Sequence, residues 1–369
     1  MKIVLVGPFP PYRGGISMFN HSLAKVLSKN HDVYRVSFSL QYPKYLFPGK
    51  TQFFDFKGEN AEPLINSVNP FSWKRTAKYI NAISPDMVIF QYWMPFFAPA
   101  FSSITKRIKK NCGAQIIVNC NNINPHEPRT TDSFMTAKFF SYCDGFIVMS
   151  KTVEKDLKKI EPNPKYRKTP HPIYDIFGEC LDQKTAREQV GVSSEKIILN
   201  FGLIRDYKGL DILIESAKYL KGKLDNFKIL VVGECYGDEN EYIQLAEKNG
   251  VSDVVEFRFE FVPNEKVNQY FCASDLIVLP YKSATQSGVV PIAYHFNKPV
   301  VVSNVGGLPE IVEVGKTGFV CEPDSASIAK GVMQYFKSDM DQYPPFIAEY
   351  KKRFSWENFA KVVLELAQS

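Results

Sequence analysis

The sequence lacks several features that mark out whole classes of protein. No run of 18 or more apolar residues occurs, so we expect no membrane-spanning helix. The apolar stretch after Met1 is short and no small-residue cleavage site follows it, which predicts a first β-strand and not a signal peptide. Seven cysteines are spread along the chain without a Cys-x-x-Cys pair, so we expect reduced thiols, a cytoplasmic location and no zinc site.

What the chain does contain is enough apolar material for two cores. It has 369 residues, 45% of them hydrophobic and 23% charged, which is ordinary for a globular protein. A chain of this length exceeds one ordinary core, and we expect two domains.

The net charge of +6 is unevenly distributed. Residues 1–172 carry 24 Lys and Arg against 11 Asp and Glu, whereas the remainder carries 21 against 28. This asymmetry indicates that the first half contacts an anionic partner. A solvated basic surface without a partner is the alternative.

Short apolar runs alternate with helical patterns along the whole chain. This alternation predicts parallel sheets covered on both faces, hence two doubly wound α/β domains with ligands bound in a cleft between them. Residues 161–172 contain four prolines and are predicted to form a linker or domain boundary. The expected strands are 2–6, 32–38, 87–91, 115–119, 145–149, 196–200, 228–232, 254–257, 276–279 and 300–303. The expected helices of the first half are 17–28, 72–83, 98–110, 133–142 and 152–160.

The first candidate site is the loop between the first strand and the first helix, which contains Gly14 and Gly15. Adjacent glycines allow a ligand to approach the backbone, and the helix N-terminus that follows favours an anion. The loop is not Gly-x-Gly-x-x-Gly, and no acidic residue closes the second strand, so a nicotinamide enzyme is disfavoured. A proline-rich turn without function is the alternative interpretation.

A second candidate site follows the first strand of the second half. Gly202 ends the strand, and Arg205 and Lys208 precede a helix that opens at Gly209. Arginine can bind phosphate oxygens through two parallel hydrogen bonds, and lysine acts as a point charge, so the pair indicates diphosphate binding. The alternative is a surface pair engaged in salt bridges.

From this loop onwards the sequence resembles a known family, the retaining GT-B glycosyltransferases of family 4. The resemblance covers nearly the whole chain, including the Gly14-Gly15 loop. It implies an acceptor-side domain over residues 1–172, a nucleotide-sugar domain over residues 173–350 and a final helix, residues 351–369, that returns to the first domain. It is carried by GLIRDYKGLDILIE (202–215), LVVGE (230–234), FVPNEKV (261–267), ASDLIVLPY (273–281), KPVVVSNVGGLPEIVE (298–313), TGFV (317–320) and RFSWENFAK (353–361).

The resemblance also implies roles for single residues. Gly14 and Gly15 would approach the donor phosphates, Lys208 would bind the diphosphate, and the backbone at Val262 would meet the nucleobase. The arginine usual in the family lies five residues before that lysine, where this chain has Leu203, so Arg205 is expected to substitute for it.

The chain departs from the family at the Glu-x7-Glu motif. Depending on the alignment, the two glutamates are replaced by Ala284 and Ile292 or by Gln286 and Tyr294. The loop still ends in Ser-Gly before a helix, whose amides can serve a phosphate or a sugar. The donor contacts expected here are Gln286, Ser287, Gly288 and Val289.

On the acceptor side, Asn121 occupies the position where relatives often have a histidine against the donor sugar. His126 follows five residues later, with Glu127 and Arg129 beside it. Whether His126 substitutes for the missing histidine or binds an acceptor phosphate together with Arg129 stays open.

We expect no metal and no cofactor. Asp339 and Asp341 form an Asp-x-Asp triplet, but it lies in an acidic segment between helices and not after a strand. Cationic side chains and helix N-termini can stabilise a leaving diphosphate without a metal.

Aromatic and basic segments of the first half suggest a membrane surface as the anionic partner. Residues 92–101 and 40–57 mix aromatic rings with other apolar or basic side chains, and residues 106–110 contain four cations. We expect peripheral binding to the inner face of a membrane and no nucleic acid among the partners.

Together these features and the resemblance predict transfer of a sugar from a UDP- or GDP-sugar to a saccharide or lipid-linked acceptor, in polysaccharide or lipid-linked oligosaccharide synthesis. Retention of the anomeric configuration is what the resemblance implies. Arg205 and Lys208, with His126, are the expected catalytic residues. A nucleotide-sugar epimerase of the same architecture and a non-catalytic carbohydrate-binding relative remain as alternatives.

Overall fold

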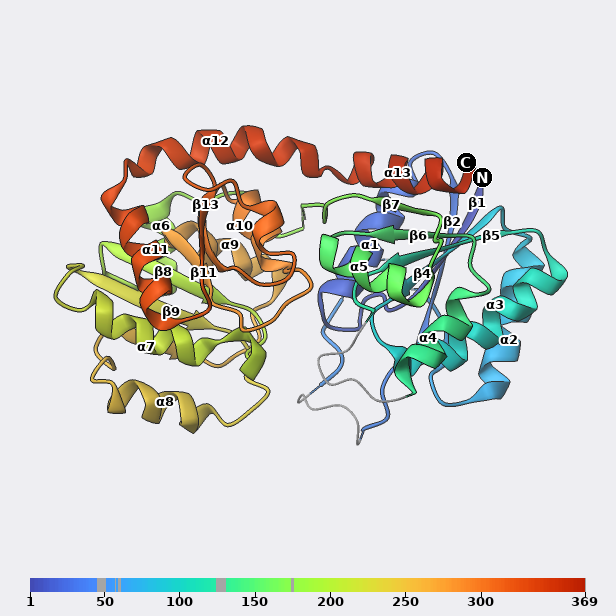
Figure 1. The fold of residues 1–369 in the computed structure, drawn as a ribbon, viewed down its shortest axis with the longest axis horizontal. Helices are drawn as coiled ribbons and strands as arrows, with labels where there is room; N and C mark the ends of the chain where they lie inside the picture. The colour runs from blue at the N-terminus through green and yellow to red at the C-terminus, as the bar shows by residue number, and fades with distance from the viewer. Residues whose placement is uncertain (45–50, 57, 59–60, 124–130, 174–175, 369) are drawn as a thin grey trace. The chain divides into compact units, whose positions relative to one another are not determined.

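The chain folds into two compact units in the computed structural model (Figure 1), which describes residues 1–44, 51–56, 58, 61–123, 131–173 and 176–368. Unit 1 comprises Met1–His171 and Trp356–Ser369, and unit 2 comprises Pro172–Ser355. No helix in the described part of the chain is long and apolar enough to cross a membrane.

Unit 1 is built on a parallel sheet with the strand order β3-β2-β1-β4-β5-β6-β7. Apart from β2 and the edge strands β3 and β7, its strands are almost entirely buried and rich in Val, Ile and Phe, as expected for a sheet covered on both faces. Its elements are β1 (Lys2–Val6), α1 (Gly15–Leu27), β2 (Asp32–Leu40), β3 (Glu62–Asn66), α2 (Pro70–Ile83), β4 (Met87–Tyr92), α3 (Ala98–Asn111), β5 (Gln115–Cys120), α4 (Asp132–Phe140), β6 (Gly145–Val148), α5 (Lys151–Ile160), β7 (Tyr166–Lys168) and α13 (Trp356–Gln368).

Alternate residues of these strands point to opposite faces of the sheet. One face meets α2, α3, α4 and α5 in a core that contains Val88, Phe90 and Phe101. In the other part of unit 1, α13 packs on α1, where the Phe19 ring lies 4.9 Å from Trp356 and 5.2 Å from Phe359. The last helix of the chain therefore completes the first unit.

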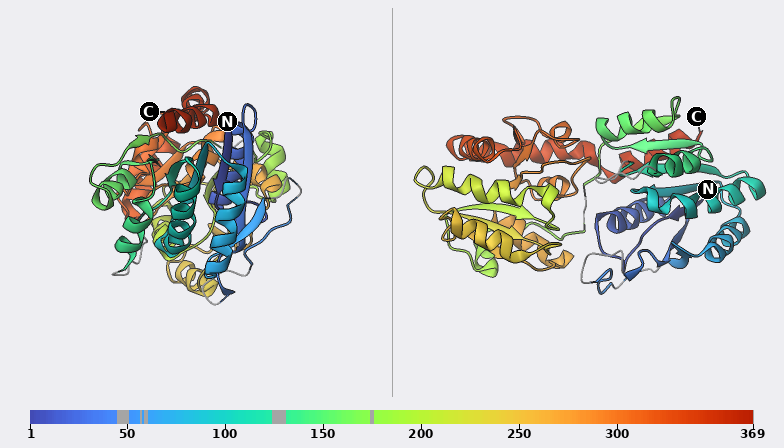
Figure 2. Two further views of the ribbon diagram at one scale, coloured as in Figure 1. Left: turned by 90° about the vertical axis from the view of Figure 1, so that its right-hand side faces the viewer. Right: turned by 60° about the horizontal axis from the view of Figure 1, so that its bottom comes forward.

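Unit 2 contains a second parallel sheet, with the order β10-β9-β8-β11-β12-β13. Helix α7 packs against α8 and α11, and α9 packs against α6 (Figure 2). The elements are α6 (Gln183–Val190), β8 (Lys196–Phe201), α7 (Leu210–Leu220), β9 (Phe227–Val232), α8 (Glu239–Lys248), β10 (Val255–Arg258), α9 (Asn264–Ala273), β11 (Leu276–Leu279), α10 (Val289–His295), β12 (Val300–Ser303), β13 (Gly318–Cys321), α11 (Ser325–Lys337) and α12 (Tyr343–Tyr350).

Two short edge strands, β3 and β7, escaped the sequence prediction, as did β13. The linker predicted for residues 161–172 is wrong for Tyr166–Lys168, because these residues pair with β6 as the edge strand β7. The prolines on either side of the strand do not disturb the sheet, since an edge strand pairs on one side only. The chain leaves unit 1 at His171.

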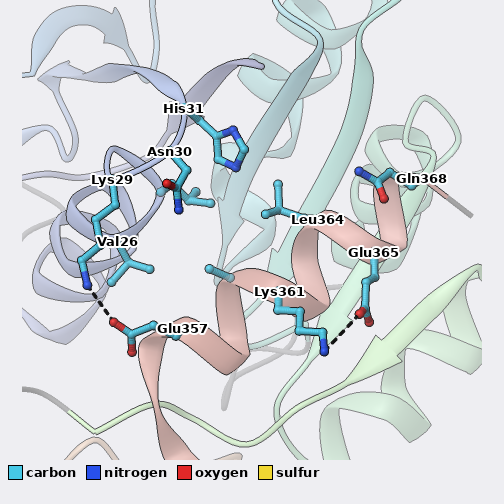
Figure 3. Close-up of a pocket in the computed structure, with 11 residues that line it drawn as sticks. Val26, Lys29, Asn30, His31, Glu357, Lys361, Leu364, Glu365 and Gln368 are labelled. Carbon is cyan, nitrogen blue, oxygen red and sulfur yellow. Dashed lines mark hydrogen bonds and ion pairs between the residues drawn. The ribbon is translucent and has the colours of Figure 1, made fainter.

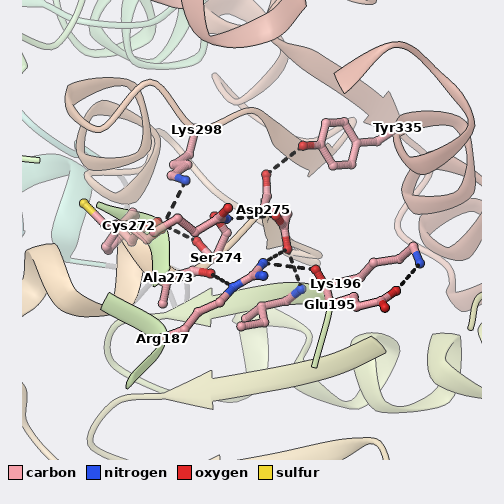
Figure 4. A network of polar contacts seen from close by, with 12 residues as sticks. Arg187, Glu195, Lys196, Cys272, Ala273, Ser274, Asp275, Lys298 and Tyr335 are labelled. Carbon is pink, nitrogen blue, oxygen red and sulfur yellow. Dashed lines mark hydrogen bonds and ion pairs between the residues drawn. The ribbon is translucent and has the colours of Figure 1, made fainter. Parts of the chain in front are cut away.

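An aspartate secures the amino end of the central strand pair in each unit. In unit 1, Asp86 accepts a hydrogen bond from the backbone amide of Lys2 at 2.7 Å. In unit 2, Asp275 accepts one from the amide of Ile197 at 2.7 Å and another from Arg187 Nη2 at 2.8 Å (Figure 4). These bonds fix the register of β1 against β4 and of β8 against β11.

Candidate functional site

In both sheets the strand order reverses direction beside the first strand of the unit. In unit 2 this point lies between β8 and β11. Ligands of open α/β sheets bind beyond the carboxyl ends of the strands at such a switch point. The loops that follow β8 (residues 202–209) and β11 (residues 280–288) are therefore the parts of unit 2 to consider first.

Glycines hold these two loops against each other. Gly209 has φ +66°, and a Cβ there would lie 2.0 Å from the carbonyl oxygen of Pro280. Only glycine fits this contact. A Cβ on Gly202 would lie 3.6 Å from both Lys208 Nζ and Val289 Cγ2, so Lys208 reaches back over the end of β8 towards the start of α10.

The two cations of the β8 loop rest on tyrosine rings. The Arg205 guanidinium lies 4.8 Å from the centre of the Tyr236 ring, and Lys208 Nζ lies 5.5 Å from the centre of the Tyr281 ring. These are favourable cation–π distances. Burial raises the pKa of Tyr281 to about 12, so this phenol stays neutral and hydrogen-bonding.

Neither Arg205 nor Lys208 forms an ion pair with a carboxylate of the described residues. The nearby Lys282 does: its Nζ lies 2.7 Å from Asp206 and 2.9 Å from Asp211. Burial, and the neighbouring charge of Arg205, lower the pKa of Lys208 below its ordinary value. An anion bound beside Lys208 would offset these two causes and raise the pKa of Lys208 again.

The β11 loop supplies polar groups beside these cations. Ser287 Oγ accepts a hydrogen bond from the Val289 amide at 3.2 Å and lies 3.4 Å from the Tyr281 hydroxyl. Among the described residues, Oε1 of Gln286 is buried without a hydrogen-bond partner. A buried acceptor of this kind is available to a ligand hydroxyl group.

The positions at which relatives carry glutamates hold no carboxylate. Alanine at position 284 has no functional group, and the side chains of Ile292 and Tyr294 are buried in the core. The Tyr294 hydroxyl donates to the Ile311 carbonyl at 2.9 Å and lies 2.9 Å from Thr317 Oγ1. These side chains stabilise unit 2 and offer nothing to a sugar.

Val262 lies between β10 and α9, at the same edge of the sheet as Gly202 but beyond β9. It is 9% exposed, so little of this residue is accessible to a ligand. No described contact joins it to the cationic loop.

In unit 1, Gly14 precedes the first helix with φ +114°, and a Cβ there would meet nothing within 4 Å. Gly15 begins α1, whose first turn contains no acidic residue. The Ser17 hydroxyl of that turn is buried without a partner among the described residues. No side chain caps this helix start, and a helix N-terminus favours an anion.

A buried amide network occupies the carboxyl ends of β4 and β5. Gln91 Oε1 accepts from Asn119 Nδ2 at 2.8 Å and from Asn121 Nδ2 at 3.0 Å, and Gln91 Nε2 donates to Asn20 at 3.3 Å. Asn121 is 7% exposed, so it belongs to this network more than to an open surface. His126, Glu127 and Arg129 lie outside the described residues.

Sequence reasoning missed Gln91, Tyr236 and Tyr281. Gln91 and Tyr281 lie at the carboxyl ends of β4 and β11, two strands that each flank a switch point, whereas Tyr236 lies beyond β9, one strand away from the switch point of unit 2. A search for polar and aromatic residues at those strand ends would have found all three, because ligand-binding groups gather there.

A hollow of about 400 Å³ in unit 1 lies away from this chemistry (Figure 3). It lies beside α1 and α13, near the amino end of β2, and is flanked by the ion pair of Lys29 with Glu357. The carboxyl ends of the strands are at the opposite edge of the sheet, so this hollow is not part of the candidate site.

The part of the chain that contains the cationic loop matches a known family. Residues 182–359 match the family described as glycosyl transferases group 1. The match includes the loops after β8, β9, β11 and β12.

Curated proteins that are similar to this chain are named as glycosyltransferases. Over 198 residues the chain is 30% identical to a D-inositol 3-phosphate glycosyltransferase of Corynebacterium urealyticum, which covers 50% of this chain and 46% of the relative. The chain thus spans about half the length of that relative. An uncharacterized glycosyltransferase of Methanocaldococcus jannaschii is 25% identical over 382 residues, covering 98% of this chain and 96% of the relative.

Solved structures show the same fold at low sequence identity. Sucrose-phosphate synthase from Thermosynechococcus elongatus matches with a TM-score of 0.75 at 16% identity, covering 100% of this chain and 98% of that one. Anabaena HepE in complex with UDP matches with a TM-score of 0.71 at 17% identity, again covering 100% and 98%. The prediction of two doubly wound α/β domains is confirmed: the fold is GT-B, and residues 182–359 match the family described as glycosyl transferases group 1.

Proposed function

We propose that this protein is a glycosyltransferase that moves a sugar from a nucleoside diphosphate sugar to a hydroxyl group of a saccharide or lipid-linked acceptor. The observation that carries the proposal is the pair Arg205 and Lys208, two cations at a switch point that rest on tyrosines and have no carboxylate partner among the described residues. A diphosphate supplies the missing negative charge. HepE was solved with UDP and with UDP-glucose, so a UDP-sugar is the first donor to test.

In the proposed reaction, the bond between the anomeric carbon and the β-phosphate oxygen breaks while a bond to the acceptor oxygen forms. Negative charge develops on the departing diphosphate, where Arg205 and Lys208 stabilise it. The acceptor hydroxyl enters from the face that the phosphate leaves, and its proton passes to the β-phosphate oxygen. The anomeric configuration is then retained without a protein nucleophile, which agrees with the absence of carboxylates at positions 284, 286, 292 and 294.

Other residues are proposed to orient the donor. Gln286 Oε1 accepts a hydrogen bond from a sugar hydroxyl, because this atom is otherwise buried without a partner in the described chain. Ser287, Gly288 and Val289 line the same loop, and the backbone at Val262 contacts the base. Gly14 and Gly15 are proposed to contact a phosphate at the start of α1, which no side chain caps.

Isothermal titration with UDP, GDP and ADP tests the diphosphate site. We expect one nucleotide to bind, and Lys208→Ala to weaken its binding by about 10- to 100-fold, since hydrogen bonds to charged groups contribute about 1.5–3 kcal/mol. Lys282→Ala removes the same charge from a lysine already paired with Asp206 and Asp211, and serves as the matched control. Equal losses in both variants, or no binding of any nucleotide, would contradict the proposal.

Turnover separates transfer from simple binding. A purified sample incubated with the donor that binds and with a mixture of lipid-linked and free saccharides should release nucleoside diphosphate, and nuclear magnetic resonance of the product reports its anomeric configuration. Binding without release of diphosphate would favour the carbohydrate-binding alternative. An inverted product would overturn the retaining mechanism.

We also propose that unit 1 binds an anionic membrane surface, where a lipid-linked acceptor would lie. Within residues 92–101, Tyr92, Phe97 and Phe101 are buried in the core, and Trp93 and Phe96 are partly buried against it, so this segment offers few exposed rings. Phe71 at the start of α2 and Phe134 on α4 are instead 84% and 75% exposed. The neighbouring helices α2 and α3 carry the exposed cations, which are Lys74, Arg75, Lys78, Lys106, Arg107, Lys109 (paired with Asp144) and Lys110.

Co-sedimentation with vesicles rich in phosphatidylserine tests this surface. Lys74→Glu combined with Lys78→Glu should reduce the bound fraction several-fold at low salt, because each cation near an anionic membrane contributes about 1 kcal/mol. Lys155→Glu combined with Lys165→Glu changes the net charge equally elsewhere on unit 1. Similar losses in the two variants would mean that net charge, and not this surface, controls binding.

A further inference from the structure

Two cysteines of unit 2 lie in direct contact although they are far apart in the sequence. The Sγ atoms of Cys180 and Cys272 are 3.3 Å apart, and the two residues are separated by 92 positions. Cys180 is exposed on the segment that enters unit 2, whereas Cys272 lies on α9 and is 1% exposed. All seven cysteines belong to the described residues, and all are free thiols in this structure.

The backbone around Cys180 is held in place on both sides. Asn268 Nδ2, on α9, donates to the Glu179 carbonyl at 3.2 Å, and the Leu181 amide donates to Cys272 Sγ at 3.2 Å. The two sulfur atoms are therefore kept together by bonds that do not depend on the sulfur contact itself. A shift of somewhat more than 1 Å would bring them to the disulfide bond length of about 2.05 Å.

The charges around the pair favour a thiolate at the exposed position. Lys298 Nζ donates to the Cys272 carbonyl at 3.3 Å, and Figure 4 shows Lys298 beside Cys272. The hydrogen bond from the Cys272 thiol, together with the ammonium groups of Lys298 and Lys351, lowers the pKa of Cys180 below the ordinary value of a thiol. Burial has the opposite effect on Cys235 and Cys321, whose pKa values it raises.

We propose that Cys180 and Cys272 are a peroxide-reactive pair that closes to a disulfide within unit 2. The Cys180 thiolate attacks one oxygen of hydrogen peroxide, the O–O bond breaks, and Cys180 becomes a sulfenic acid as the other oxygen leaves as water after protonation. The Cys272 sulfur then attacks the Cys180 sulfur, and the sulfenic oxygen leaves as a second water. Two thiols lose two electrons and two protons in total, and one peroxide is reduced to two waters.

The division of roles follows from exposure. Cys180 is accessible to a small oxidant and carries the more acidic thiol, which are the properties of an attacking cysteine. Cys272 is shielded from solvent and in contact with Cys180, so it reacts with the sulfenic acid and not with peroxide. The new bond ties the entry segment of unit 2 to α9 and closes a long loop, which stabilises the unit against unfolding.

Peptide mass spectrometry of the full chain treated with limiting peroxide tests the proposal. We expect a crosslinked peptide pair that contains Cys180 and Cys272, reversible by dithiothreitol, and a higher melting temperature for the oxidised protein. Cys272→Ser should leave Cys180 as a sulfenic acid that dimedone traps. Cys235→Ser is the matched control and should form the crosslink at the wild-type rate.

Three outcomes would overturn the proposal: oxidation of Cys180 to sulfinic acid in the wild type without a crosslink, reaction of Cys235 or Cys321 as fast as Cys180, or no reaction at all. If the buried Cys272→Ser substitution prevents folding, the exposed Cys180→Ser variant replaces it and should abolish the crosslink and the rise in melting temperature. None of these outcomes bears on nucleotide binding, so failure here leaves the proposed transferase function intact.

Discussion

The two units share a strand order around their switch points but use those points differently. In unit 2, the loop after the first strand presents Arg205 and Lys208 on tyrosine rings. In unit 1, the first loop presents the backbone of Gly14 and the open start of α1, and the strand ends beside it hold the amide network of Gln91. The same topology thus places two cations in a loop of one unit and a buried, neutral amide network in the other, because the chemistry belongs to the residues at the strand ends and not to the sheet.

The largest difference in the free energy of unfolding is expected between alanine substitutions of two glycines. Gly209→Ala should lower the free energy of unfolding of unit 2 by more than about 4 kcal/mol, because its Cβ would overlap the Pro280 carbonyl and φ is +66°. Gly14→Ala meets open space, so only the backbone cost of φ +114° with ψ 162°, about 1–3 kcal/mol, applies. Urea-induced unfolding followed by circular dichroism measures both, and equal losses would mean that the loops of unit 2 are no more tightly packed than those of unit 1.

The next largest difference in stability is expected between substitutions of the two aspartates at the amino ends of the strands. Asp275→Ala leaves Arg187 and the Ile197 amide without their acceptor and should cost about 3 kcal/mol of stability. Asp86 is exposed and accepts from the Lys2 amide, which water can replace, so Asp86→Ala should cost about 1 kcal/mol. A larger loss for Asp86→Ala than for Asp275→Ala would reverse this part of the comparison.

Substitutions of two glutamines should distinguish an amide that stabilises the fold from one that binds the ligand. Gln91→Ala removes the acceptor of two buried donors and should lower stability by about 2 kcal/mol. Gln286 Oε1 has no partner among the described residues, so Gln286→Ala should leave stability within about 0.5 kcal/mol of the wild type while weakening donor binding. Thermal melts in the absence and presence of the nucleotide sugar distinguish the two effects, and a destabilised but fully binding Gln286→Ala would contradict the assignment.

The smallest expected effect is the pH dependence of nucleotide affinity. Lys208 binds phosphate only when protonated, and its pKa in the folded protein lies below the ordinary value near 10.5. Affinity should therefore fall, by about tenfold per lost ion pair, as the pH rises through that lowered pKa. Lys208→Arg should abolish the fall because arginine stays charged. By the same sign, the unbound protein gains stability as the pH rises from the lowered pKa of Lys208 towards the ordinary value near 10.5, because the folded state releases this proton first. Nucleotide and high pH should therefore each raise stability, while high pH weakens nucleotide binding.

Much of the fold could be predicted from the sequence because its strands are continuous apolar runs. Strand β11 (Leu276–Leu279) was predicted with its observed bounds, whereas β7 (Tyr166–Lys168) was missed because an edge strand can be polar and short. The residues of the candidate site likewise divide into those that the sequence could identify and those that it could not. Arg205 and Lys208 could be identified because their loop is one stretch of sequence, but the tyrosine under each cation comes from a different strand end, and only the folded chain brings them together.

The aspartates before β4 and β11 have a consequence for how such a chain can diverge. They fix strand register at the edge of each sheet opposite the candidate site, through bonds that involve no residue of the ligand loops. Substitutions that alter the donor or the acceptor can therefore accumulate in the loops without shifting the sheets. We expect relatives with new specificities to differ first in residues 202–209 and 280–288, and engineered exchange of these loops to be tolerated where Gly209 is kept.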